Sequence, residues 1–137
     1  MVQLQITSPF LLTKYLLPSM IRKKAGDIIV ITSVWGFMGA SCEVLYSMVK
    51  GGLNTFVKAL AKEVAPSGIR VNGIAPGIID TKMNSHLTEE EREALRQEIP
   101  MGRFGKPSEV ADLVEFLLSE RATYINGEII SINGAWY

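Results

Sequence analysis

Apolar positions along the chain follow two different spacings, and the spacing predicts the type of each element. Continuous apolar runs rich in β-branched residues predict three buried strands, over residues 28–32, 69–75 and 128–132. Apolar residues at helical spacing predict three helices, over residues 5–23, 44–65 and 107–119, and a capping box predicts a fourth over residues 88–98. Because strands alternate with helices, the sequence predicts an α/β fold with a parallel sheet, in a single domain over residues 1–137.

Local signals refine this pattern at three places. Thr88 has the position of a capping-box residue and predicts a helix start. Two adjacent glycines at 51–52 lie inside a predicted helix and indicate that another element packs closely there. Residues 33–43 are predicted to form a loop whose glycines allow the backbone to approach a ligand. Residues 80–85 carry no clear pattern.

The composition is typical of a globular protein and excludes several classes of partner. Of the 137 residues, 47% are hydrophobic and 20% are charged, and the formal net charge is zero. A chain without net charge is not attracted as a whole to nucleic acid or to an anionic membrane. The single cysteine, Cys42, cannot form an internal disulfide, and the sequence contains no cluster of metal ligands. Since Lys14 and two prolines interrupt the apolar start, we expect neither a signal peptide nor a transmembrane helix, and a cytoplasmic protein.

Candidate chemistry lies where one predicted strand ends and the next helix begins. Ser33 follows the first strand, and Tyr46 and Lys50 lie four residues apart on one helix face. A free tyrosine titrates near about 10, and a neighbouring ammonium favours the phenolate, so such a tyrosine can exchange a proton with a carbonyl or alcohol oxygen. Pro76 and Gly77 follow the second strand and should share this rim, because ligands bind beyond the carboxyl ends of parallel strands. On spacing alone, a half-buried tyrosine beside a surface lysine is the commoner explanation.

The residues around these positions make the pattern specific. Ser33 is followed thirteen residues later by Tyr-Ser-Met-Val-Lys at 46–50, which resembles the active-site signature of the short-chain dehydrogenase/reductase family. Segments 70–81, 102–111 and 124–127 resemble further blocks of that family, in the same order. Within the family, the chain is most similar to the 3-oxoacyl-acyl-carrier-protein reductase branch, which implies a place in fatty acid biosynthesis.

The resemblance implies a Rossmann-like, doubly wound parallel sheet and a role for each matching residue. Tyr46 would be the general acid/base, and Lys50 would favour its ionised form and hydrogen-bond the nicotinamide ribose. Ser33 would orient the substrate carbonyl. Gln5 stands where the family often has an asparagine that anchors a water in the proton relay, so that relay would be altered or absent.

The resemblance also implies a cofactor and a substrate class. Pro76 and Gly77 would shape the wall of the nicotinamide site, and the Ile79 backbone and Thr81 would contact the carboxamide. The cofactor would be NADP or NAD, with NADPH favoured by the branch. The substrate would be a small-molecule carbonyl or an acyl thioester, with acyl-carrier protein as a candidate partner.

One part of the family pattern is missing from these residues. The chain contains no G-x-G-x-x-G turn, which in this family binds the cofactor pyrophosphate. We therefore expect the three strands to form the C-terminal part of a larger sheet, the nucleotide-binding half to be absent, and the isolated chain to be inactive or to bind cofactor weakly. Residues 28–32 would then form an unpaired edge strand, which favours association.

The resemblance implies subunit contacts as well. The helices over 5–23 and 44–65 would pair subunits into a homodimer or homotetramer, and Trp136 and Tyr137 would pack across an interface. Trp35 and Phe37 either line the substrate pocket or simply pack. Two alternatives to an enzyme remain: a non-catalytic interaction or dimerisation fragment, and a fragment with no function of its own.

Overall fold

The three predicted strands form one parallel sheet in the computed structural model, which describes residues 1–137. The strands are β1 (Gly26–Ile31), β2 (Ile69–Pro76) and β3 (Ile129–Ile132), hydrogen-bonded in the order β1-β2-β3. Because all three run in the same direction, their carboxyl ends meet at one rim of the sheet. The prediction of an α/β fold with a parallel sheet is confirmed.

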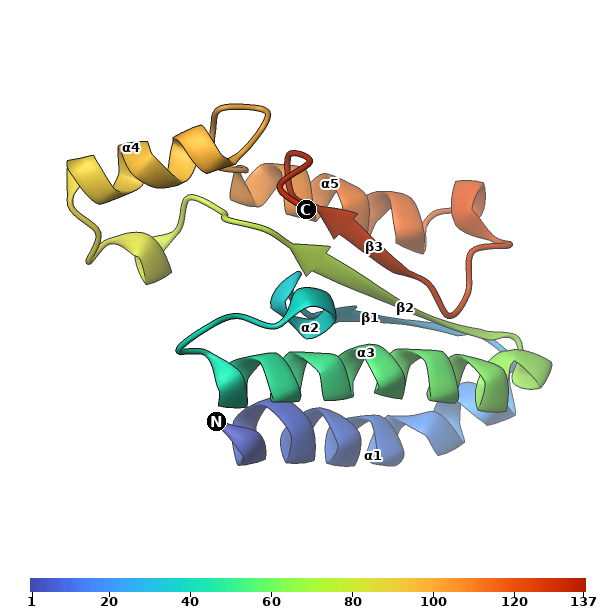
Figure 1. Cartoon of the computed structure of the whole chain (residues 1–137). Helices are drawn as coiled ribbons and strands as arrows, with labels where there is room; N and C mark the ends of the chain where they lie inside the picture. The colour runs from blue at the N-terminus through green and yellow to red at the C-terminus, as the bar shows by residue number, and fades with distance from the viewer.

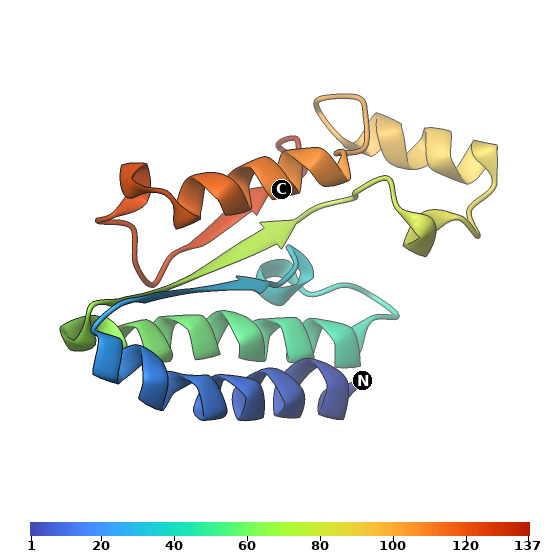
Figure 2. The same cartoon turned by 180° about the vertical axis from the view of Figure 1, so that it is seen from behind.

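Helices cover both faces of this sheet. Figure 1 shows α1 (Ser8–Lys23) and α3 (Val44–Val64) side by side on one face and α5 (Pro107–Leu118) on the other, and Figure 2 shows the same layers from behind. The helix α4 (Glu89–Glu98) lies apart, beyond the carboxyl ends of the strands. Since these helices cover the two faces of the sheet, the loops that follow the strands form the rim at the carboxyl ends.

Each face of the sheet has its own apolar core. The larger core joins α3 to β2 and contains Val57, Leu60, Ala61, Val64, Ile69 and Val71. The smaller core lies under α5 and contains Ile74, Leu117 and Ala122. Since Val71 and Ile74 belong to opposite cores, β2 is buried on both faces, as its continuous apolar run predicted.

Short helical turns are the elements that the apolar pattern did not predict. The predicted helix over 5–23 begins with a π-helical turn, η1 (Gln3–Thr7), ahead of α1, and the predicted loop 33–43 contains the one-turn helix α2 (Trp35–Met38). Three 3-10 turns connect other elements: η2 (Ala65–Ser67), η3 (Lys82–Asn84) and η4 (Glu120–Ala122). Turns of three to five residues are too short to show a helical repeat of apolar positions.

Two further predictions concern α4 and β1. The capping box is confirmed, because the Glu91 backbone N–H donates to Thr88 Oγ1 (3.2 Å) and the Thr88 N–H donates to Glu91 Oε2 (2.8 Å). The strand β1 is an edge strand, paired only with β2. None of the helices combines the length and the hydropathy that a membrane span requires.

Candidate active site

Ser33 lies at the rim of the sheet, two residues beyond the end of β1. The ladder between β1 and β2 continues past the last strand residue, because the Thr32 N–H donates to the Ile74 carbonyl (2.7 Å) and the Val34 N–H donates to the Pro76 carbonyl (3.2 Å). Ser33 is held between these two bonds and is buried. Its Oγ accepts the Trp35 N–H (3.2 Å), so the hydroxyl proton remains available to a ligand.

Tyr46 and Lys50 lie on consecutive turns near the start of α3. The Lys50 ammonium nitrogen is 5.4 Å from the centre of the Tyr46 ring, so the predicted pair on one helix face is confirmed. Lys50 Nζ also donates to the Ile31 carbonyl at the end of β1 (3.3 Å), and this bond fixes α3 against the rim. Burial lowers the pKa of Lys50 from its ordinary value.

The helix α2, which follows Ser33, packs against the turn of α3 that carries Lys50. A Cβ atom on Gly36 would lie 2.7 Å from the Lys50 carbonyl carbon, and one on Gly51 would lie 3.3 Å from the Gly36 oxygen. The two backbones are therefore in direct contact. The interpretation that the glycines of 33–43 allow a ligand to approach is wrong for Gly36, since α3 occupies that space; the prediction of close packing at Gly51 is confirmed.

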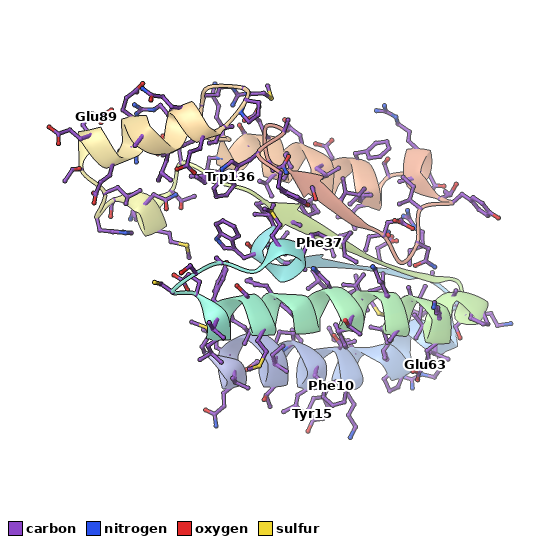
Figure 3. The ribbon with its side chains drawn as sticks, in the orientation of Figure 1. Phe10, Tyr15, Phe37, Glu63, Glu89 and Trp136 are labelled. Carbon is purple, nitrogen blue, oxygen red and sulfur yellow. The ribbon has the colours of Figure 1, made fainter.

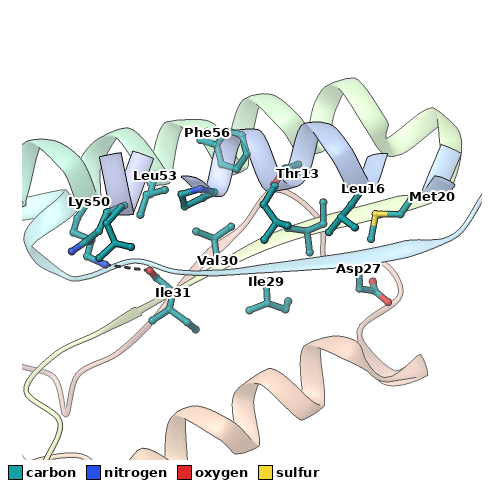
Figure 4. Close-up of a pocket in the computed structure, with 15 residues that line it drawn as sticks. Thr13, Leu16, Met20, Asp27, Ile29, Val30, Ile31, Lys50, Leu53 and Phe56 are labelled. Atoms are coloured by element: carbon teal, nitrogen blue, oxygen red, sulfur yellow. Dashed lines mark hydrogen bonds between the residues drawn. The ribbon is translucent and has the colours of Figure 1, made fainter. Parts of the chain in front are cut away.

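A groove of about 480 Å³ follows the open side of β1 (Figure 4). Residues of α1, β1 and α3 line it, and Lys50, Leu53 and Phe56 form its α3 wall. Gln5 lines the same groove, and its side-chain oxygen is buried without a hydrogen-bond partner. The structure thus brings Gln5 and Lys50 to one groove, while Ser33 lies outside its lining.

The segment after β2 forms the neighbouring part of the rim. Gly77 donates its N–H to the Ile132 carbonyl (3.0 Å), and a Cβ on Gly77 would lie 2.9 Å from the Asn133 side chain. The Ile79 carbonyl accepts the Asn84 amide (2.7 Å), and Thr81 is exposed. Pro76 and Gly77 lie on the same rim as Ser33, as predicted.

Asn54 is a candidate site residue that the sequence interpretation missed. Both polar atoms of its side-chain amide are buried without a hydrogen-bond partner, and its nitrogen would lie 2.8 Å from a Cβ on Gly36. It follows Lys50 by one helical turn. Its sequence signal was a polar residue inside the apolar, inward-facing stripe of a helix.

Comparison with known proteins identifies a matching family model and several proteins that are similar to this chain. The family model described as enoyl-(acyl carrier protein) reductase matches residues 1–136. The chain is 58% identical to the uncharacterized oxidoreductase YmfI of Bacillus subtilis over 137 residues, which are 100% of this chain and 57% of that protein. It is 46% identical to the 3-oxoacyl-[acyl-carrier-protein] reductase FabG of Aquifex aeolicus over 136 residues, which are 99% of this chain and 55% of that protein.

A solved structure shows the same fold. The short-chain dehydrogenase/reductase of Brucella melitensis superposes with a TM-score of 0.91 at 34% sequence identity, over 99% of this chain and 54% of that one. The chain therefore spans about half the length of the relatives it matches. Its three strands and flanking helices correspond to the C-terminal half of the Rossmann fold of these proteins.

Proposed function

This chain belongs to the short-chain dehydrogenase/reductase family, and we propose that it supplies the proton-transfer part of an NAD(P)-dependent oxidoreductase that reduces a carbonyl. One observation carries the proposal: the Lys50 ammonium lies beside the Tyr46 ring on a rim where the Ser33 hydroxyl proton is free. The names of the FabG relatives favour a 3-oxoacyl thioester as the substrate and acyl-carrier protein as a partner.

The residues at the rim suit a nicotinamide nucleotide. The Lys50 ammonium has three N–H donors and uses one on the Ile31 carbonyl, which leaves donors for the ribose hydroxyls. We assign the wall of the nicotinamide site to Pro76, Gly77 and Ile79, with Thr81 at its outer end. A nicotinamide cofactor, when bound, supplies the hydride, and the protein supplies orientation and the proton.

Two side chains, Tyr46 and Ser33, then act on the substrate oxygen, and Lys50 and Gln5 act on Tyr46. Tyr46 gives its phenolic proton to that oxygen as negative charge develops there, which makes it the general acid. The neighbouring Lys50 ammonium stabilises the phenolate that remains. Ser33 donates a hydrogen bond to the same oxygen and fixes the orientation of the carbonyl. Gln5, with its unpaired oxygen in the groove beside Lys50, is assigned to the relay that returns a proton to Tyr46.

The phosphate groups need a binding site that these residues do not provide, because the sequence has no G-x-G-x-x-G turn. The relatives contain a further part of the fold that this chain does not match. We propose that this part binds the phosphates and pairs with the open edge of β1. The lining of the groove beside that edge is mostly apolar and includes Lys50. The 137 residues alone should therefore bind NADPH weakly and reduce no substrate.

A fusion tests this proposal. The part of YmfI that this chain does not match is placed ahead of residue 1, and NADPH oxidation with an acetoacetyl thioester is followed by absorbance. We expect the fusion to reduce the thioester and the separate chain to be inactive. Tyr46→Phe should lower kcat of the fusion by about 10²–10⁴-fold with an unchanged Kd for NADPH.

Tyr15→Phe is the matched control, since this tyrosine is exposed on the outer side of α1 and should retain full activity (Figure 3). Full activity of the Tyr46→Phe fusion would refute the role of this tyrosine. A folded fusion that oxidises no NADPH with any carbonyl would refute the proposed function as a whole.

A second candidate function is subunit pairing without catalysis. It rests on large apolar side chains that are exposed on α1 and α3, namely Leu12, Tyr15, Val44 and Met48. Burying such a surface between two copies would stabilise a dimer. Light scattering after size exclusion should give a dimer for the chain and a monomer for Val44→Glu. A monomeric unsubstituted chain would exclude this function.

A further inference from the structure

Both aromatic residues at the end of the chain, Trp136 and Tyr137, contact α2. The Trp136 ring packs edge-to-face on Trp35, with ring centres 4.9 Å apart and an angle of 64° between the planes. The Tyr137 ring stacks on Phe37, with centres 6.3 Å apart and an angle of 29°. Figure 3 shows Phe37 on α2 and Trp136 in the C-terminal tail. The tail, residues 133–137, therefore packs on both aromatic residues of this one-turn helix.

The tail is itself fixed to the sheet. The Trp136 N–H donates to the Asn133 carbonyl (3.2 Å), and the Ala135 N–H donates to Asn133 Oδ1 (3.1 Å). The Tyr137 hydroxyl and the Ser131 hydroxyl of β3 are hydrogen-bonded. The tail thus forms a turn at the carboxyl end of β3 that is hydrogen-bonded to this strand.

The helix α2 is held from a second direction by α3. Its Gly36 lies in backbone contact with Lys50, on the helix that also carries Tyr46. The tail and α3 therefore restrict the position of α2 together. Because Ser33 lies two residues before the start of α2 and accepts the Trp35 N–H, a displacement of α2 would displace the Ser33 hydroxyl.

We propose that Trp136 and Tyr137 are positioning residues for Ser33. They press α2 against the Lys50 turn and keep the Ser33 hydroxyl at a fixed distance from the phenol of Tyr46. This role rests on the proposed function, because it concerns the geometry of the substrate carbonyl. It adds to that function a dependence of catalysis on the last two residues of the chain.

The expected effect is on kcat rather than on cofactor binding. A misplacement of about 1 Å at a catalytic group can cost about 10²-fold in rate. Trp136→Ala in the YmfI fusion should lower kcat by roughly 10–100-fold, and the Kd for NADPH should not change. Trp136→Phe keeps an aromatic ring and should restore most of the rate. Tyr137→Ala, at a half-exposed position, should fold and should give a smaller decrease.

Tyr124→Ala is the matched control, because this tyrosine is fully exposed and lies in the connection between η4 and β3. A spectroscopic readout accompanies the kinetics. Trp35 and Trp136 are the only tryptophans of the chain, so their coupling gives an exciton signal in circular dichroism. The exciton signal should be present in the unsubstituted chain and absent in Trp136→Ala. If Trp136 had a purely structural role, its substitution would remove the signal and leave kcat unchanged.

The outcomes separate the two proposals. An active fusion in which Trp136→Ala and Tyr137→Ala both match Tyr124→Ala in kcat would overturn the positioning role alone. Absence of the exciton signal in the unsubstituted chain would also overturn it, since the rings would not be in contact. An inactive but folded unsubstituted fusion would overturn the proposed function, and the positioning role with it.

Discussion

Gly36→Ala places a methyl group at the contact between α2 and α3. The new Cβ would lie 2.7 Å from the Lys50 carbonyl carbon and 2.8 Å from its oxygen, whereas ordinary van der Waals contact begins at 3.4 Å. The opposing atoms belong to the helix backbone, so no side-chain rotation relieves the overlap. The helix α2 must move away from α3 by about 0.7 Å, the difference between the two distances.

The free energy cost follows from this displacement. Forcing an extra methyl group into a close-packed contact typically costs about 1–3 kcal/mol. A gap of about 0.5–1 Å also removes a quarter to a half of the dispersion energy of the surrounding contacts. The higher helix propensity of alanine offsets at most about 1 kcal/mol. We expect the free energy of unfolding to fall by about 1–2 kcal/mol, or roughly 5–30-fold in the folding equilibrium constant.

Urea unfolding followed by far-UV circular dichroism measures this change, and equal m-values show that the compactness of both states is unchanged. Gly52→Ala is the control, because its Cβ would meet only the end of the Ile6 side chain, at 3.2 Å. That side chain can rotate, so Gly52→Ala should raise the free energy of unfolding by up to about 1 kcal/mol. If Gly36→Ala unfolds at the same or a higher urea concentration than the unsubstituted protein, α2 is not held against α3 as described.

Three other substitutions test the fold. Leu117→Ala removes a fully buried side chain and should lower the free energy of unfolding, measured with urea, by about 2–5 kcal/mol. Leu118→Ala is the control, because this neighbour is exposed and its substitution should change that free energy by no more than about 0.5 kcal/mol. Equal changes for the two variants would contradict the assigned core. Arg70→Met should cost about 1.5–3 kcal/mol by the same assay, because two backbone carbonyls at the end of α5 and η4 lose their guanidinium donor. The hydrogen bond from Arg103 holds the pKa of Glu109 at about 2, below the ordinary 4.5, so its stabilising effect is full above pH 4.5 and is lost as the pH falls towards 2. Glu109→Gln should therefore unfold at lower urea than the unsubstituted protein at pH 7, and the two midpoints should converge below pH 4.5.

The candidate site was predicted from the sequence where its geometry is local. A spacing of four residues places Tyr46 and Lys50 on one face of any α-helix, and a residue that follows a parallel strand lies on the carboxyl rim, as Ser33 does. The cation–ring distance of 5.4 Å confirms the first of these predictions. The catalytic roles themselves stay predictions, with the fusion as their test.

Interactions between distant segments could not be predicted in this way. The hydrogen bond from Lys50 to the Ile31 carbonyl depends on where α3 crosses β1. The local sequences of these two elements do not specify that crossing point. The sequence indicates space for a ligand at Gly36, because it does not show that the α3 backbone fills that space. The same holds for the pairing of Trp136 with Trp35, which are far apart in the sequence.

The sequence by itself determined the order and type of the main elements, because burial on one or both faces imposes a periodicity that is visible in a single chain. It also determined which side chains bring chemistry to the rim, through spacing within one helix and position after one strand. Only the tertiary structure decided how α2 is held between α3 and the tail, and where the groove along β1 lies. These features are set by close packing between separate elements, where displacements of less than 1 Å decide whether atoms touch, and no local pattern encodes them.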